Sequence, residues 1–159
     1  MHPNLEIITF EPQYKEAFVE LNYQWLEEFF EIEPYDRIVL EQCETKILTP
    51  GGHIFMVLEN QNVVGTFAFV KLDEGVYEFT KMAVRPEKRN QGIGNQMMTF
   101  SIRFAEQQHW KKLILYSNRI LENSIYLYQK YGYQEIPIDE DIPYMRGDIQ
   151  MELEIKKAD

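Results

Sequence analysis

The segment Arg89-Asn90-Gln91-Gly92-Ile93-Gly94 has residue types and spacing that could bind phosphate. It follows an apolar run and precedes a helical pattern, so a strand should lead through it into a helix. The first N–H groups of a helix and the positive end of its dipole suit a diphosphate, and glycine lets phosphate oxygens approach the backbone. Glycine at a helix start also serves close packing, so the segment alone leaves both interpretations open.

Two other classes of phosphate site do not fit these residues. No Gly-Lys-Ser/Thr follows the turn, as a nucleoside triphosphate loop requires, and Met97 stands where a dinucleotide fingerprint has its third glycine. A metal site has little support, because His2, His53 and His109 are scattered and show no paired spacing with Cys or Asp. We therefore expect no metal and interpret His53 or His109 as structural.

Hydrophobic periodicity predicts the elements that must position this turn. Runs rich in β-branched and aromatic residues predict strands, at 5–10, 54–59, 63–72, 76–84, 113–116, 133–136 and 149–155. Apolar residues at helical spacing predict helices, at 12–29, 36–48, 93–104 and 123–131. Pro34 should stop the first helix, Asn123 should cap the last, and Gly132 should end it as a left-handed residue.

The order of these elements predicts how the strands pair. Short turns make the three strands between 54 and 84 an antiparallel meander. The strand, helix, strand unit that follows should be a right-handed parallel crossover, so the sheet should be mixed.

Length and charge limit the class of protein. A chain of 159 residues, with no repeat and no linker, is expected to be a single domain. Its formal net charge of −10 would repel a nucleic acid backbone, so nucleic acid is an unexpected partner. The longest apolar stretches, such as 63–70, are too short to span a membrane.

The compartment is expected to be the cytoplasm. The start of the chain, at 1–6, has no basic segment followed by an apolar run, as a secretory signal would have. The single cysteine, Cys43, cannot form an internal disulfide and is interpreted as a small buried apolar group.

Two segments carry a resemblance to a known family. Arg89-x-x-Gly92-x-Gly94, preceded by Lys81-Met82-Ala83-Val84-Arg85-Pro86, resembles the acetyl-coenzyme A signature of the GNAT superfamily of N-acetyltransferases. The stretch from Asn123 to Tyr133 is similar to the family's late helix, and the element order matches over nearly the whole chain. Asn90 stands where many members have glycine, and Ser124 where alanine is usual, but Asn tolerates left-handed backbone angles well.

The resemblance implies an α/β (α+β) fold and a cofactor site. The fold is a mixed, mostly antiparallel sheet of about seven strands with helices on both faces, in the order β-α-α-β-β-β-α-β-α-β-β. One domain would cover residues 1–159. The backbone at 82–84 would line the pantetheine arm of acetyl-coenzyme A, and 89–94 would hold its pyrophosphate. The implied cofactor residues are Met82, Ala83, Val84, Arg89, Asn90, Gln91, Gly92, Ile93, Gly94, Asn118 and Asn123.

Acetyl transfer to an amine needs a base, because a lysine-like amine with a pKa of about 10.4 is mostly protonated at neutral pH. Glu78 is the candidate, since strict alternation along the strand 76–84 puts its carboxylate on the same face as Met82 and Val84. Family members often have a glutamate near this position. The other interpretation, a solvated or cross-strand-paired glutamate near a hairpin turn, remains open.

The departing thiolate needs a proton, and the resemblance puts Tyr128 at the family's general-acid position. Among ten tyrosines most should be packing residues, and Tyr126 and Tyr131 are interpreted in that way. A backbone N–H at Met82 would donate to the thioester oxygen, and transfer would be direct.

The expected acceptor is a small-molecule or peptide amine. The acidic, aromatic segment 27–36 would favour a cationic amine such as a polyamine, although it could simply be a solvated helix face followed by a loop. The chain could act as a monomer or a homodimer, with no membrane partner.

Two alternatives to this function remain open. One is a non-catalytic acetyl-coenzyme A sensor or interaction domain, and the other is an acyltransferase that uses a longer acyl-coenzyme A. The acidic loop 138–143 could be a lid or only a connection.

Overall fold

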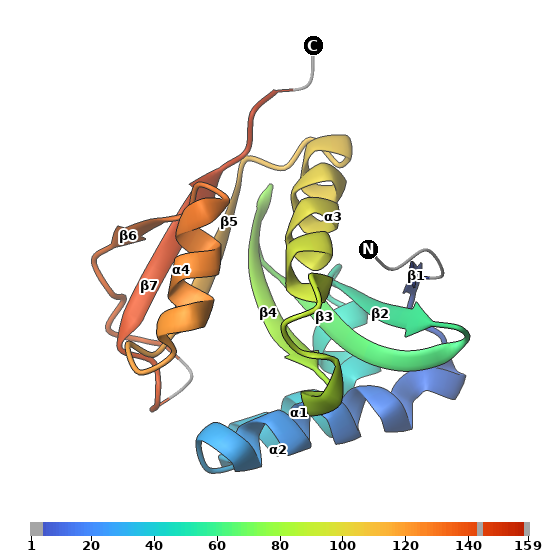
Figure 1. The fold of residues 1–159 in the computed structure, drawn as a ribbon. Helices are drawn as coiled ribbons and strands as arrows, with labels where there is room; N and C mark the ends of the chain where they lie inside the picture. Colours follow the sequence, from blue (N-terminus) through green and yellow to red (C-terminus); the bar gives the residue numbers. More distant parts are fainter. Residues whose placement is uncertain (1–4, 143–144, 158–159) are drawn as a thin grey trace.

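A seven-stranded sheet forms the centre of the protein (Figure 1). The structure is a computed structural model that describes residues 5–142 and 145–157, so Met1–Asn4, with His2, and Pro143 lie outside the described residues. The strand order is β1-β2-β3-β4-β5-β7-β6. The bounds are β1 (Leu5–Thr9), β2 (His53–Glu59), β3 (Asn62–Asp73), β4 (Val76–Val84), β5 (Lys112–Ser117), β6 (Gln134–Ile136) and β7 (Ile149–Glu154).

Helices cover both faces of this sheet, and each face has its own hydrophobic core. The helices are η1 (Pro12–Tyr14), α1 (Lys15–Phe29), α2 (Pro34–Glu41), η2 (Glu44–Leu48), η3 (Pro86–Lys88), α3 (Ile93–Gln107) and α4 (Glu122–Lys130). One core contains residues of α1, α2 and η2, including Phe18, Leu40 and Ile47. The other contains α3 residues, including Met97 and Met98, with α4 packed against it. The predicted fold class and element order are confirmed.

The strands pair as predicted, with one short parallel pair. β1 to β4 form an antiparallel meander, and β4 pairs with β5 in parallel. This parallel pairing covers only Val76–Glu78 and Lys112–Ile114. Beyond it the two strands diverge (Figure 1).

A β-bulge in β4 overturns one expectation. The register with β3 shifts between Thr66 and Ala68, and Lys81 has a φ of 57°. Tyr77 and Phe79 lie in the α3 core, and Met82 and Val84 pack against the same core. Glu78, between Tyr77 and Phe79, therefore points to the other face, toward α1 and α2. The prediction that Glu78 shares a face with Met82 and Val84 was wrong, because the bulge adds one residue to the alternation.

Several helix ends also differ from the prediction. Pro34 ends no helix but begins α2, whose start is closed by a capping box between Glu33 and Asp36. The predicted helix 36–48 is divided into α2 and the π-helical turn η2. Leu121, not Asn123, precedes the first residue of α4, because the side chain of Asn118 already organises the turn before it. Gly132 has the predicted left-handed backbone, with a φ of 100°.

Cys43 is fully buried, as predicted, and burial raises the pKa of its thiol to about 11. No helix in the described part of the chain is long and apolar enough to span a membrane.

Candidate active site

A groove of about 660 Å³ lies between the start of α3 and the start of α4. Neither helix has a side-chain hydrogen bond at its N-cap, and the first residues of both helices line the groove. Trp25 and Phe29 of α1 close one side. The remaining lining residues are Val84, Lys88, Arg89, Asn90, Gly92, Ile93, Gly94, Asn95, Ile120, Leu121, Glu122, Asn123, Ser124, Tyr126, Leu127 and Lys130.

The turn that begins α3 depends on two left-handed residues. Gly92 has a φ of 85° and Asn90 a φ of 62°. A Cβ atom on Gly92 would meet nothing within 4 Å, so this position needs glycine for its backbone angle and not for space. A Cβ atom on Gly94 would lie 3.4 Å from Leu127 Cδ2, so Gly94 also serves the packing of α3 against α4. The packing interpretation therefore holds for Gly94, while Gly92 is required by the backbone conformation of the turn.

Cations surround the groove, although the chain as a whole is acidic. Lys88, Arg89 and Lys130 all line it, and Glu122 is the acidic residue among its lining. Arg89 Nη1 contacts Glu28 Oε2 at 2.6 Å, while Arg89 Nη2 is buried and has no hydrogen-bond partner among the described residues. A buried donor without an acceptor beside two helix N-termini fits an anionic group such as a diphosphate.

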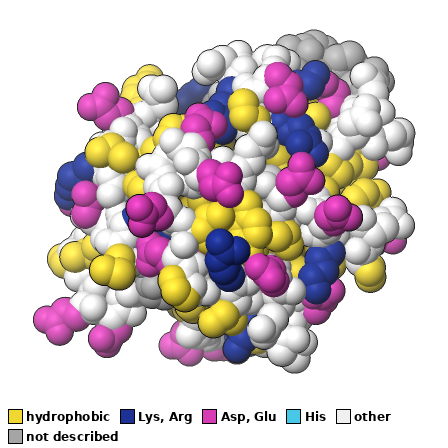
Figure 2. All heavy atoms as spheres, turned by 90° about the horizontal axis from the view of Figure 1, so that it is seen from below, with side chains coloured by type: hydrophobic (Ala, Val, Ile, Leu, Met, Phe, Trp, Pro, Cys, Tyr) yellow, Lys and Arg dark blue, Asp and Glu magenta, His cyan; other side chains and the backbone are white. Residues whose placement is uncertain are grey.

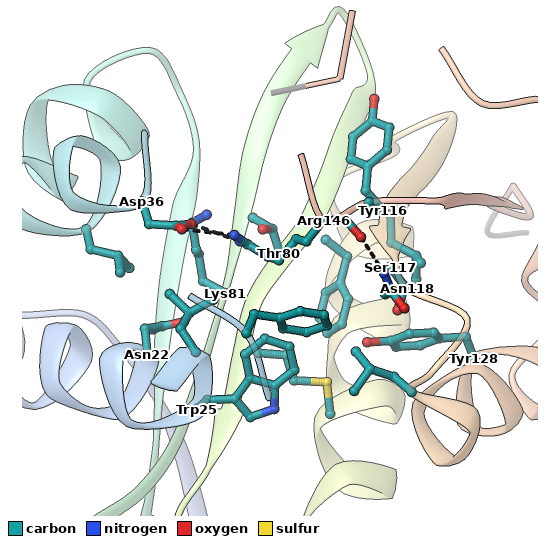
Figure 3. Close-up of a pocket in the computed structure, with 18 residues that line it drawn as sticks. Asn22, Trp25, Asp36, Thr80, Lys81, Tyr116, Ser117, Asn118, Tyr128 and Arg146 are labelled. Carbon is teal, nitrogen blue, oxygen red and sulfur yellow. Dashed lines mark hydrogen bonds and ion pairs between the residues drawn. The ribbon is translucent and has the colours of Figure 1, made fainter. Parts of the chain in front are cut away.

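A smaller cavity, of about 90 Å³, lies where β4 and β5 diverge (Figure 3). Trp25 and Leu121 line both this cavity and the groove, so these two side chains lie between the two hollows. The other lining residues come from α1, α2, β4, β5, α4 and the segment before β7: Asn22, Leu26, Phe30, Asp36, Leu40, Phe79, Thr80, Lys81, Met82, Leu115, Tyr116, Ser117, Asn118, Tyr128, Arg146 and Gly147.

Tyr128 enters this cavity from α4, with its hydroxyl directed inward (Figure 3). Burial raises the pKa of Tyr128 to about 12, so the phenol stays protonated at neutral pH. Its ring packs against Tyr133, with the ring centroids 5.9 Å apart. The side chain is thus a proton donor held in an apolar wall.

Glu78 and Lys81 form a buried pair of opposite charges on the α1 side of β4. Glu78 is only 5% exposed, and burial raises the pKa of its carboxyl, while the charge of Lys81 acts in the opposite direction. Burial lowers the pKa of Lys81 to about 8, although Glu78 and Asp36 favour its charged form. The pKa of the Glu78 carboxyl is therefore shifted upward and that of the Lys81 ammonium downward, each in the direction of neutral pH.

Carboxylates of the acidic segment 27–36 contact two arginines from other parts of the chain. Glu28 contacts Arg89, as described above, while Glu33 and Asp36 both contact Arg146, which belongs to the segment before β7. The view in Figure 2, from below Figure 1, shows acidic and basic side chains mixed with hydrophobic ones over this face, not gathered in one acidic patch. Three carboxylates of the segment are therefore already matched by arginines.

A model of the acetyltransferase (GNAT) family matches residues 15–133. The chain belongs to this family. No curated protein matches the sequence significantly.

Solved structures share the fold of this GNAT acetyltransferase at low sequence identity. A GNAT family acetyltransferase from Staphylococcus aureus is 24% identical with a TM-score of 0.85, covering 96% of this chain and 99% of its own. Spermidine N-acetyltransferase from Vibrio cholerae, in complex with CoA and spermine, is 16% identical with a TM-score of 0.76, covering 96% of each chain. A Bacillus subtilis acetyltransferase in complex with CoA is 19% identical with a TM-score of 0.73, covering 96% of this chain and 99% of its own.

The structure of this GNAT chain brings most of the predicted cofactor residues to the two hollows. The groove is lined by Val84, Arg89, Asn90, Gly92, Ile93, Gly94 and Asn123, and the cavity by Met82 and Asn118. Ala83 and Gln91 line neither: Ala83 is 2% exposed, and the Gln91 side chain is exposed and donates to the carbonyl of Glu87. Tyr128 lines the cavity, whereas Glu78 does not line it but is close enough to Lys81, which does, for the charge of Lys81 to affect its pKa.

Sequence reasoning did not identify several residues that line the site, among them Trp25, Lys81, Leu121 and Arg146. Lys81 stands next to the recognised motif, and its charge inside an apolar strand was a signal that could have been used. Trp25 was assigned to helix packing, and nothing near Leu121 or Arg146 in the sequence marks them.

Metal ligands are not gathered in the described residues, where no group of three or more His, Cys, Asp or Glu side chains could hold an ion. His53 is part of an aromatic cluster that includes Phe104, and burial lowers its pKa.

Proposed function

We propose that this protein transfers an acetyl group from acetyl-coenzyme A to a primary amine, by direct attack of the amine within a ternary complex. The observation that carries the proposal is that two neighbouring hollows share the lining residues Trp25 and Leu121. One is a basic groove at two helix N-termini, and the other is a small cavity that holds a buried phenol. Residues 1–159 would act as one domain.

The groove would bind the cofactor through its diphosphate. The N–H groups at the start of α3, Arg89 Nη2 and the side chains of Lys88 and Lys130 are the donors and cations for this role. The pantetheine arm would follow β4 past Val84 and Met82 into the gap between β4 and β5. Coenzyme A in the Bacillus subtilis and Vibrio cholerae structures supports this cofactor class.

The cavity would carry the chemistry. Glu78, directly or through water, would take a proton from the ammonium form of the acceptor, and the neutral amine would attack the thioester carbonyl. The backbone N–H of Met82 would donate to the carbonyl oxygen as negative charge develops on it. The carbon–sulfur bond then breaks, Tyr128 would give its proton to the departing sulfur, and the resulting phenolate would recover a proton from the attacking nitrogen as the amide forms. A cavity of about 90 Å³ favours an acetyl group over a longer acyl chain.

The acceptor would be an amine that carries one positive charge. The Vibrio cholerae protein is named for an amine substrate and has spermine bound, which supports an amine acceptor. The argument for a polyamine came from the acidic segment 27–36, and Glu28, Glu33 and Asp36 in that segment each contact an arginine. Those contacts reduce the acidic charge that the segment could offer to a polyamine.

Calorimetry followed by an activity screen tests the proposal. We expect acetyl-coenzyme A and free coenzyme A both to bind, and at least one amine of a broad panel to be acetylated at a rate set by the enzyme concentration. The absence of binding to either form would overturn the cofactor assignment. Tight binding with no turnover of any amine would favour a sensor, and faster use of a longer acyl-coenzyme A would overturn the acetyl assignment.

A further inference from the structure

The segment before β7 crosses the cavity and is held on both sides. On the α2 side, the backbone N–H of Met145 donates to Glu33 Oε1 at 3.1 Å. On the β5 side, Asn118 Nδ2 donates to the carbonyl oxygen of Arg146 at 2.6 Å. Figure 3 shows Asn118 beside Arg146 on one side and the Arg146 guanidinium directed to Asp36 on the other. The position of this guanidinium is therefore set by both walls of the cavity.

The groups around the Arg146 guanidinium form a cage for a cation. Its two terminal nitrogens contact the carboxylate of Asp36 at 2.8 and 2.9 Å, and Nη1 also contacts Glu33 Oε2 at 3.0 Å. The ring of Phe30 lies 5.9 Å from the guanidinium carbon. Asp36 is only 1% exposed, so this pairing is shielded from solvent. An ammonium group would be bound by the same carboxylates and ring, and the protein has filled that place with its own arginine.

The charges around the cavity leave room for one more cation. The charge cluster consists of the carboxyl groups of Glu33, Asp36 and Glu78 and the cations Lys81 and Arg146. Three acids against two bases give an excess of one negative charge. This excess is the same whether Glu78 and Lys81 are both charged or both neutral, because the proton only moves within that pair.

We propose that Arg146 determines acceptor specificity by restricting the cavity to amines with a single positive charge. This inference rests on the proposed function. A monoamine arrives as one ammonium ion and balances the cluster. A diamine brings a second ammonium to a place where Arg146 already occupies the carboxylates, so the second charge would be desolvated without a partner.

Replacing Arg146 gives the decisive variant. Arg146→Met raises the excess to two negative charges and empties the cage, so kcat/KM for 1,4-diaminobutane relative to butylamine should rise about tenfold. Arg146→Lys keeps the charge and should leave the ratio within about twofold of wild type. Wild type itself should use butylamine at least as well as the diamine. A preference of wild type for the diamine, or an unchanged ratio in Arg146→Met, would overturn the proposal.

A double variant covers the risk that Arg146→Met does not fold, because it leaves Asp36 buried without a partner. Arg146→Met with Asp36→Asn restores the excess of one negative charge and should return the ratio to that of wild type. If it keeps the diamine preference of Arg146→Met, charge is not the cause and the proposal fails. If Arg146→Met does not fold, Arg146→Lys and the double variant provide the test. A preference of either variant for the diamine overturns the proposal. A ratio of kcat/KM equal to that of wild type in both variants supports it.

Arg119→Met is the matched control. Arg119 pairs with Glu135 in an exposed position and does not line the cavity, so this variant changes the net charge equally and should not change the ratio. Calorimetry of both amines with coenzyme A-loaded protein separates the two levels of the argument. If wild type acetylates no amine, the proposed function fails. The charge argument is then still tested by binding: Arg146→Met should bind the diamine more tightly than wild type does. Equal binding of the diamine by the two proteins would overturn the charge argument.

Discussion

The groove and the cavity are built in different ways. The groove comes mainly from two continuous pieces of chain, 88–95 and 120–130, and its donors are largely backbone N–H groups at helix starts. The cavity is lined by side chains from α1, α2, β4, β5, α4 and the segment before β7, which are far apart in the sequence. Backbone N–H groups can bind a diphosphate largely independently of the side chains around them. Proton transfer, in contrast, depends on individual side chains. Groove variants should therefore change cofactor affinity, and cavity variants should change turnover.

Tyr128→Phe is the strongest test of this division. Removing the phenol removes the proposed proton donor to the departing sulfur, so kcat should fall by about 1,000-fold, with the Kd for acetyl-coenzyme A within about threefold of wild type. Steady-state kinetics and calorimetry measure the two quantities. Tyr126→Phe is the control, because Tyr126 lies on the same helix and is 70% exposed. Full turnover by Tyr128→Phe would remove this residue from the mechanism.

Glu78→Gln should have the next largest effect, and one that depends on pH. Burial raises the pKa of the Glu78 carboxyl, and only its ionised form can accept a proton. The ratio of wild-type to variant kcat/KM should therefore increase as pH rises through this raised pKa, then level off at about 100. Dividing by the variant cancels the titration of the amine substrate.

The control for this prediction is Glu135→Gln, at an exposed carboxylate that contacts Arg119 outside the cavity. It should behave as wild type at every pH. A ratio for Glu78→Gln that stays near one across the pH range would show that water or another group is the base.

The two regions also differ in how far sequence alone could predict them. The turn from Arg89 to Gly94 is recognisable because its function follows from local backbone conformation, which a short motif determines. The strands and helices were found for the same reason, since hydrophobic periodicity is local. The cavity depends on tertiary pairing. The bulge at Lys81 is a property of the register between β3 and β4, so the orientation of Glu78 could not be derived from alternation within β4.

Arg146 shows the same limit more clearly. It lies 110 residues from Asp36 in the sequence, and their pairing depends on how the segment before β7 crosses the sheet edge to reach α2. The sequence left two interpretations of the acidic segment 27–36 open, a site for a cationic amine or a solvated helix face, and neither included its arginine partners. Charge patterns along one segment predict a binding preference only when the segment has no partner elsewhere in the fold.

Gly92→Ala should have the smallest of these effects, and it should act on the cofactor alone. Its φ of 85° suits glycine, and an alanine there costs about 1–2 kcal/mol, while its added Cβ atom would meet no other group. If the turn relaxes to avoid this strain, the N–H groups at the start of α3 move, and affinity for coenzyme A should fall about tenfold with little change in kcat at saturation. Asn90→Gly is the matched control, because Asn90 has a φ of 62° and glycine relieves strain there, so affinity should be kept or improved. Calorimetry with coenzyme A measures both. Equal affinity of the two variants would mean that side chains, not the backbone of this turn, hold the diphosphate.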